Sequence, residues 1–326
     1  MIELNQLNFV GAGLSRPECV LCTADGSLHI ADWRGGVTII KPDGTQETIL
    51  AKGGFKPKPN GIAILREGGW LLAHLGDTDG GVYRLSPDGQ LKPEILDVDG
   101  RPLPPTNYVH IDGQDRIWIT VSTRRQPRAL GYCKDCRDGF IILVDSDGAR
   151  IVADDLGYTN ECLVHPETGQ LYVNETFSRR LTRFDVAQDG MLSHKTTIAQ
   201  FGHGTFPDGL TFDVDGGVWI TSIVSNRVIR VSPDGEQDVI LQDAPSQDLD
   251  IVEKAYHASV MDATHLGQAY GACLKNISSA AFGGADLRTL YLGCLLGEEL
   301  AYFQSPIQGL KPYHWDWFTM ADMVQK

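Results

Sequence analysis

The stretch PDGLTFDVDGGVWIT at residues 207–221 decides the fold. A polar turn at Pro207 and Asp208 leads into a short apolar segment, a glycine-containing turn follows at 215–217, and a second apolar segment ends at Thr221. Short runs of β-branched and aromatic residues between glycine turns are typical of antiparallel strands. The stretch therefore predicts a pair of antiparallel β-strands.

The same pattern recurs at five other places in the chain. Each repeat continues with a polar loop and a third predicted strand, and third strands end in Asp-Gly turns such as SPDGQ at 86–90 and SPDGE at 232–236. Repeats of about 40–50 residues have the length of β-propeller blades. The other repeats begin with RPECVLCTADGSLHIAD (16–32), PNGIAILREGGWLLAH (59–74), TNYVHIDGQDRIWIT (106–120), TNECLVHPETGQLYVNE (159–175) and SSAAFGGADLRTLYLG (278–293).

Six such repeats predict an all-β chain that folds as a six-bladed β-propeller, in one domain over residues 1–326. We expect the N-terminal residues 2–9 to complete the last blade as its outer strand, because closing the ring removes exposed sheet edges. Two insertions interrupt the repeats. One, near 122–137, is rich in arginine, and the other, near 244–274, is expected to form helical or loop structure over one face.

The charge and hydropathy of the chain argue against nucleic-acid and membrane partners. The net charge is −14 and no run of Lys and Arg could follow a phosphate backbone, so nucleic acid is not an expected partner. No apolar run reaches the roughly 18–20 residues that span a bilayer, and the first residues do not resemble a secretory signal. We expect no membrane partner and a cytoplasmic location, and the sequence indicates no particular oligomeric state.

The seven cysteines do not predict a disulfide framework, because their number is odd. Cys133 and Cys136 have the CxxC spacing of zinc and redox sites. No His or further Cys lies near them in sequence, so ordinary buried or surface thiols are the favoured interpretation.

Each repeat begins with a polar residue where the innermost strand of a blade is expected to start. Innermost strands line the central channel of a propeller, so these side chains should converge at its mouth. The groups that could bind a metal are carboxylates, amides and a hydroxyl, all of which offer oxygen atoms. Oxygen ligands favour a hard cation such as Ca²⁺. Turn formation explains the Asn, Asp and Ser equally well, but not the glutamate. The six residues are Glu18, Asn60, Asn107, Asn160, Asp208 and Ser279.

Several of these segments resemble the gluconolactonase, senescence marker protein (regucalcin) and luciferin-regenerating enzyme family. The matching segments are RPECVL (16–21), KPNGIA (58–63), YTNECLVHPETGQLYVNETFSRRLTRFD (158–185), FPDGLTFDVDGGVWIT (206–221) and ISSAAFGGADLRTLYLG (277–293). The resemblance implies a six-bladed propeller with one divalent ion, Ca²⁺ before Zn²⁺, Mn²⁺ or Mg²⁺, and the hydrolysis of a small lactone or ester. Such an ion polarises the carbonyl and stabilises the oxyanion that forms.

Carried over by position, the resemblance implies that Glu18, Asn160 and Asp208 bind the metal and that Asp208 is also the candidate general base. The candidate substrate contacts are Asn60, Asn107 and His203. Plain turn residues, and a loop histidine bonded to backbone, are the competing interpretations for Asn60 and His203.

The third repeat departs from the family's sugar lactonases, which usually have a basic residue before its asparagine and an acid after it. Here Thr106 and Tyr108 flank Asn107, which makes an apolar or aromatic lactone or ester an equal candidate. Two other functions stay open: a non-catalytic, metal-stabilised propeller that binds a metabolite or protein, and an organophosphate hydrolase that uses the same ion.

Overall fold

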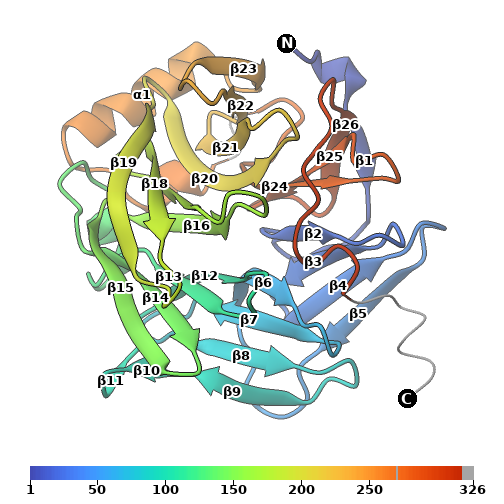
Figure 1. Ribbon diagram of the computed structural model, residues 1–326. Helices are drawn as coiled ribbons and strands as arrows, with labels where there is room; N and C mark the ends of the chain where they lie inside the picture. Colours follow the sequence, from blue (N-terminus) through green and yellow to red (C-terminus); the bar gives the residue numbers. More distant parts are fainter. Residues whose placement is uncertain (269–270, 318–326) are drawn as a thin grey trace.

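The protein consists of six four-stranded antiparallel sheets arranged around a central axis (Figure 1). The computed structural model describes residues 1–268 and 271–317. The first three blades are β2 (Val20–Cys22), β3 (Leu28–Asp32), β4 (Gly36–Ile40) and β5 (Gln46–Leu50); β6 (Pro59–Ile64), β7 (Trp70–His74), β8 (Val82–Leu85) and β9 (Leu91–Ile95); and β12 (Thr106–Ile111), β13 (Ile117–Val121), β14 (Gly139–Asp145) and β15 (Gly148–Leu156). The hairpin β10 (Asp97–Val98) and β11 (Arg101–Pro102) lies between the second and third blades in sequence.

The remaining blades complete the ring. They are β16 (Thr159–Val164), β17 (Leu171–Glu175), β18 (Arg180–Val186) and β19 (Leu192–Gln200); β20 (Thr205–Phe212), β21 (Val218–Val224), β22 (Arg227–Val231) and β23 (Gln237–Leu241); and β24 (Ile277–Gly283), β25 (Thr289–Cys294), β26 (Leu300–Gln304) and β1 (Asn8–Val10). Neighbouring innermost strands contact one another around the axis. The prediction of an all-β, six-bladed propeller is confirmed.

The last blade joins the two ends of the chain. Strand β1 pairs antiparallel with β26, with Asn8 opposite Tyr302 and Val10 opposite Leu300. The N-terminal segment therefore covers the outer edge of a sheet whose other strands come from the C-terminal part, as the sequence predicts. The strand is shorter than the predicted 2–9, because it spans only Asn8–Val10. This pairing links the N-terminal segment to the last repeat and covers one edge of the last blade.

Buried tryptophans between the blades hold the ring rigid. Trp118 and Trp219 have no exposed surface. Each donates its indole N–H to an aspartate six residues earlier, Trp118 to Asp112 at 2.9 Å and Trp219 to Asp213 at 2.7 Å. A buried indole without its acceptor costs about 1–3 kcal/mol, so these pairs favour one packing between neighbouring blades.

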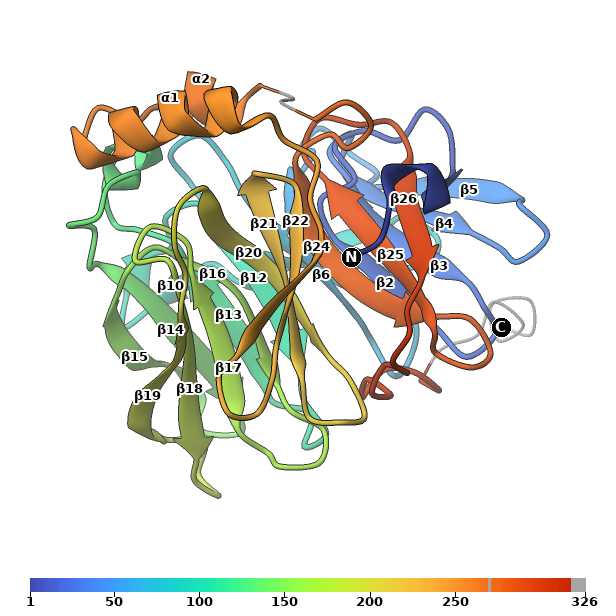
Figure 2. The ribbon, with the colours of Figure 1, turned by 90° about the horizontal axis from the view of Figure 1, so that it is seen from above.

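The helices lie outside the repeats. The 3₁₀ turn η1 (Leu4–Gln6) precedes β1, and η2 (Arg128–Gly131) follows β13 in the first insertion. The second insertion forms α1 (Ser246–His257) and α2 (Ala263–Leu266), which lie together on one side of the propeller (Figure 2). Residues 269–270 of this insertion, and 318–326 of the expected domain, lie outside the described residues. No helix in the described part of the chain is long and apolar enough to cross a bilayer.

An ion pair anchors α1 to the fourth blade. Arg179 and Glu253 are both buried, and their side chains lie 2.6 Å apart. The Tyr256 hydroxyl also donates to the backbone oxygen of Phe177 at 2.6 Å. The helical insertion is therefore packed firmly against the blades, at the end of the channel where the innermost strands begin.

Candidate functional site

Five innermost strands have a register irregularity at the same place. In β20, for example, the pairing shifts between Pro207 and Leu210, and in β16 it shifts between Thr159 and Cys162. A β-bulge of this kind inserts a residue and turns its side chain out of the regular alternation. The residues at the shift are Asn60, Asn107, Asn160, Asp208 and Ser278. Glu18 has the corresponding place just before β2.

Four of these side chains meet in one cavity at the mouth of the channel, here called the mouth cavity. Glu18, Asn107, Asn160 and Asp208 all line it, and its volume is about 160 Å³. All four are at least nine-tenths buried. Residues from both insertions complete the wall, including Arg128 and Tyr132 from the first and Leu266 from the second.

The two carboxylates of the mouth cavity are both buried, and of the two only Glu18 has an ion-pair partner, Arg16, among the described residues. Burial raises the pKa of Asp208 well above its usual range, and the negative charges of Glu18 and Glu161 add to the increase. A carboxylate that is both buried and close to another is stabilised in its charged form by a nearby cation. The pair therefore fits a divalent ion, which would be neutralised by two carboxylates.

The asparagines supply the other donors. The side-chain oxygens of Asn107 and Asn160 are buried and have no hydrogen-bond partner among the described residues. Asn160 Nδ2 donates to Thr176 Oγ1 at 3.1 Å, so the amide is fixed through its nitrogen and its oxygen is left for another partner. Within the described residues no three His, Cys, Asp or Glu side chains are grouped to hold a metal, so an ion here would need the amide oxygens.

Two arginines that the sequence analysis did not assign also line the mouth cavity. Arg16 donates to Glu18 Oε2 at 2.9 Å and lies 4.2 Å above the ring of Trp33. Arg128 donates through Nε to the Tyr158 hydroxyl at 2.9 Å. Arg16 and Tyr158 have φ angles of +46° and +69°, and each lies two residues before a predicted metal ligand. Strained backbone is common where a side chain must be aimed at a functional site.

Comparison with known proteins identifies the family. The sequence model of the SMP-30/Gluconolactonase/LRE-like region matches residues 16–245, more than half of the chain. The chain belongs to this family. The resemblance found in the sequence is thereby confirmed.

Relatives of this SMP-30/gluconolactonase-family chain are lactonases. The 6-deoxy-6-sulfogluconolactonase of Pseudomonas putida is 28% identical over 282 residues, which cover 84% of this chain and 79% of that protein. Lactonase drp35 of Staphylococcus saprophyticus is 25% identical over 223 residues, 64% of each chain. The membership and these relatives support a hydrolase.

Solved structures of the same family share the fold. A gluconolactonase from Xanthomonas campestris superimposes with a TM-score of 0.67 at 19% identity, covering 92% of this chain and 89% of that one. The calcium-binding protein regucalcin from Agrobacterium tumefaciens gives a TM-score of 0.65 at 15% identity, with 93% and 96% covered.

The other sequence-predicted positions of this family member lie away from the mouth cavity. Asn60 is buried at its bulge but is not among the residues that line the cavity. His203 is half-exposed, and its Nε2 lies 3.0 Å from Asp250 Oδ1 on α1. Ser279 does not have the position that we predicted: the bulge of β24 makes Ser278 equivalent to Asp208, and the Ser279 hydroxyl accepts a hydrogen bond from the backbone of Val20.

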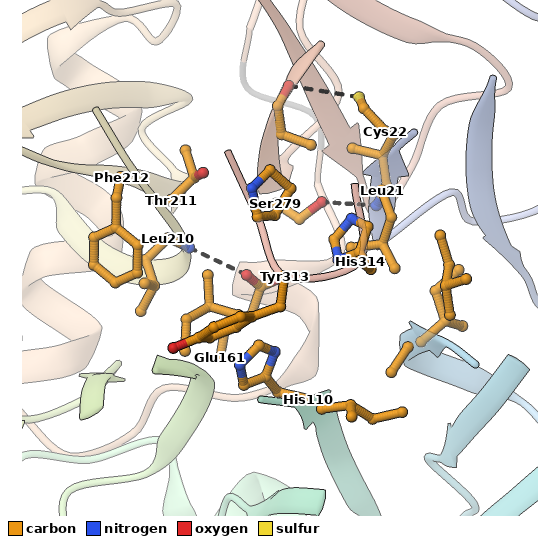
Figure 3. A pocket seen from close by; sticks show the side chains of 18 of the residues that line it. Leu21, Cys22, His110, Glu161, Leu210, Thr211, Phe212, Ser279, Tyr313 and His314 are labelled. Carbon is orange, nitrogen blue, oxygen red and sulfur yellow. Dashed lines mark hydrogen bonds between the residues drawn. The ribbon is translucent and has the colours of Figure 1, made fainter. Parts of the chain in front are cut away.

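A second cavity, here called the far cavity, lies farther along the same innermost strands (Figure 3). Its volume is about 60 Å³, its walls are mostly apolar, and the segment 310–317 closes it. Burial lowers the pKa of His110 to about 4 and raises that of Glu161, which accepts a hydrogen bond from the backbone of Leu210 at 3.1 Å. Burial therefore favours the neutral forms of His110 and Glu161, as it does for Asp208 in the mouth cavity, but no arginine or lysine of the described residues lines the far cavity.

Proposed function

We propose that this chain is a divalent-metal-dependent hydrolase that opens a small lactone, or cleaves a small ester, in the mouth cavity. The observation that carries the proposal is the meeting of two buried carboxylates, Glu18 and Asp208, with the partnerless amide oxygens of Asn107 and Asn160. Glu18, Asn160 and Asp208 would hold the ion. Ca²⁺ is the expected ion because the donors are oxygen atoms, with Zn²⁺, Mn²⁺ and Mg²⁺ as alternatives.

Membership of the SMP-30/gluconolactonase family and the lactonase relatives support this reaction class. The Pseudomonas relative is named for a sulfonated gluconolactone, which supports a small lactone as the substrate here. A cavity of about 160 Å³ also fits a small ring better than a polymer.

The bound cation would polarise the lactone carbonyl and stabilise the negative charge that develops on its oxygen. Asp208 is the proposed general base, which takes a proton from the attacking water and returns it to the ring oxygen that leaves. Arg16 holds the Glu18 carboxylate in place through its hydrogen bond. The Thr176 hydroxyl holds the Asn160 amide, with its oxygen free of other partners.

The test is turnover of a panel of sugar, aliphatic and aromatic lactones with a pH indicator, in defined metal. We expect at least one lactone to be hydrolysed, a chelator to stop the reaction, and Ca²⁺, Mn²⁺ or Zn²⁺ to restore it. Turnover that is indifferent to chelation would reject the metal-dependent mechanism.

Thermal unfolding gives a readout that does not depend on turnover. An ion at 100 times its Kd stabilises the folded protein by about 2.7 kcal/mol. Added metal should therefore raise the unfolding midpoint of the parent, and Glu18→Gln should lose this shift. Glu167→Gln, which changes an exposed carboxylate, is the matched control and should keep the shift.

A further inference from the structure

The mouth cavity contains a guanidinium group, that of Arg128, with only one of its nitrogens hydrogen-bonded to the described residues. Arg128 is partly buried in η2 and lines the cavity. Its Nε donates to the Tyr158 hydroxyl, and its guanidinium lies 5.7 Å from the centre of the Tyr158 ring. Among the described residues, its two terminal nitrogens have no hydrogen-bond partner. Their N–H groups are therefore available to a ligand in the cavity.

Neighbouring arginines of the same insertion are different. Arg124 donates to the backbone oxygen of Asp138 and, with both terminal nitrogens, to the carboxylate of Asp154 at 2.8 and 2.9 Å. Arg125 donates to the backbone oxygens of Leu130 and Asp135. Both side chains hold loop structure together, whereas the terminal nitrogens of Arg128 do not.

In the structure, the charges of Glu18 and Asp208 interact with that of Arg128, but a divalent ion bound by these two carboxylates would take up their charge instead. Glu18 and Asp208 are the two carboxylates of the mouth cavity, and Arg16 is already paired with Glu18. If the two carboxylates neutralise a divalent cation, the cavity has a surplus of positive charge. The whole chain has a net charge of −14, which repels anions at long range, so attraction of an anion must come from contact within the cavity.

We propose that Arg128 binds an anionic group of the substrate, so that the preferred lactone or ester carries a carboxylate, sulfonate or phosphate group apart from the bond that is hydrolysed. The two terminal nitrogens of a guanidinium match the spacing of two oxygens in such a group and bind it through paired hydrogen bonds. The inference rests on the proposed function, because it assigns a substrate class to the same cavity.

Aromatic side chains beside Arg128 limit the directions in which its guanidinium group can point. Tyr132 and Tyr158 pack edge to face with their ring centres 5.5 Å apart, and Phe177 stacks on Tyr132 at 5.0 Å. Tyr158, which these neighbours pack against, holds the Arg128 side chain through its hydroxyl and its ring, which lowers the entropy cost of ordering Arg128 when an anion binds. A preorganised guanidinium in a partly desolvated wall is favoured for anion recognition over a flexible lysine.

The experiment compares three stable hydroxy acids by titration calorimetry: gluconate, glucarate and 6-phosphogluconate, of which the last two carry an additional anionic group. We expect the parent to bind glucarate or 6-phosphogluconate at least about 10-fold tighter than gluconate, since charge-assisted hydrogen bonds contribute about 10- to 100-fold. The carboxylate and phosphate arms distinguish the kind of anion. Equal affinity for all three, or no binding of either glucarate or 6-phosphogluconate, would overturn the inference.

Variants test whether Arg128 is responsible. The affinity ratio is that of glucarate or 6-phosphogluconate to gluconate. Arg128→Met should reduce this ratio at least about 10-fold, and Arg128→Lys should keep part of it because the charge remains. Arg124→Met should leave the ratio unchanged. A ratio that survives Arg128→Met in a folded variant, as judged by circular dichroism, would assign the preference to another residue and overturn the inference.

Lactone turnover, measured in parallel, separates the two proposals. If lactones are hydrolysed but the parent shows no preference for glucarate or 6-phosphogluconate over gluconate, the hydrolase stands and the Arg128 inference is wrong. If no lactone in the panel is hydrolysed but binding of glucarate or 6-phosphogluconate depends on Arg128, the anion site stands and the proposed reaction is wrong.

Discussion

The mouth cavity and the far cavity are built on the same innermost strands, yet they differ in the charged side chains that line them. On β12, Asn107 lines the mouth cavity, and His110, three residues later, lines the far cavity. On β16 the change takes a single residue, from Asn160 to Glu161. The propeller brings side chains together at every level of its channel, so convergence alone does not make a functional site.

The difference lies in charge and in partners. The mouth cavity gathers two carboxylates and two guanidinium groups, and insertion residues form part of its wall. Among the described residues, the far cavity is lined by one carboxylic acid, Glu161, and by no arginine or lysine, and residues of the segment 310–317 form part of its wall. Clustering of buried charges costs stability, and such clusters are typical of binding and catalytic sites.

The largest expected difference is between variants of the two buried acids, Asp208 in the mouth cavity and Glu161 in the far cavity. Asp208→Asn should lower kcat by about 10²–10⁴-fold, because the proposed base and one metal ligand are removed. Glu161→Gln keeps a neutral side chain of the same shape in the far cavity and should retain most of the turnover. The measurement is indicator-based lactone hydrolysis, with circular dichroism as the check that both variants are folded.

Equal losses in the two variants would show that the levels are not functionally distinct. Full activity of Asp208→Asn would remove Asp208 from the mechanism.

A smaller effect is expected from the two residues of β12. Asn107→Ala should reduce kcat/KM by about 10- to 100-fold, because an amide that contacts a charged group contributes about 1.5–3 kcal/mol. His110→Phe fills the same apolar space and removes a ring nitrogen that has no partner among the described residues, so kcat/KM should change little. Steady-state kinetics on one lactone measures both. A larger loss in His110→Phe than in Asn107→Ala would reverse the assignment of the two cavities.

The smallest expected effect is on acid stability. Burial lowers the pKa of His110 from 6.5 to about 4, although Asp112 opposes the shift. The unfolded chain then binds more protons than the folded protein between these values, so stability falls as the pH falls through this range. At about pH 5.5 the parent should have lost about 1 kcal/mol more of its unfolding free energy than His110→Phe has lost.

Urea unfolding at neutral pH and at about pH 5.5 measures this difference. Identical acid losses in the parent and in His110→Phe would mean that His110 is not kept neutral by the far cavity.

The sequence predicted the repeat residues that meet at the mouth cavity better than it predicted the other residues that line this cavity. Glu18, Asn107, Asn160 and Asp208 share one place in their repeats, and the structure brings them together. Their roles as ligands, contact or base stay predictions. Ser279 was placed one residue off, because the bulge adds a residue that cannot be located from strand alternation alone.

Arg128 was missed for a different reason. It lies in an insertion of non-repeating sequence, where no equivalent positions in other blades indicate which way a side chain points. The arginine-rich composition of 122–137 was the only signal. His203 was predicted as a substrate contact because it lies five residues before Asp208 in sequence. In the structure its side chain instead points toward Asp250 on α1.

The sequence by itself determined the number of blades, the closure by β1 and the radial meeting of the repeat positions, because strand alternation and glycine turns are local properties that recur with a fixed period. Only the tertiary structure decided which level of the channel gathers charge, which arginines line it and what each loop residue faces. Those features depend on bulges and on the packing of insertions against blades, and contacts between distant segments leave no periodic trace in the chain.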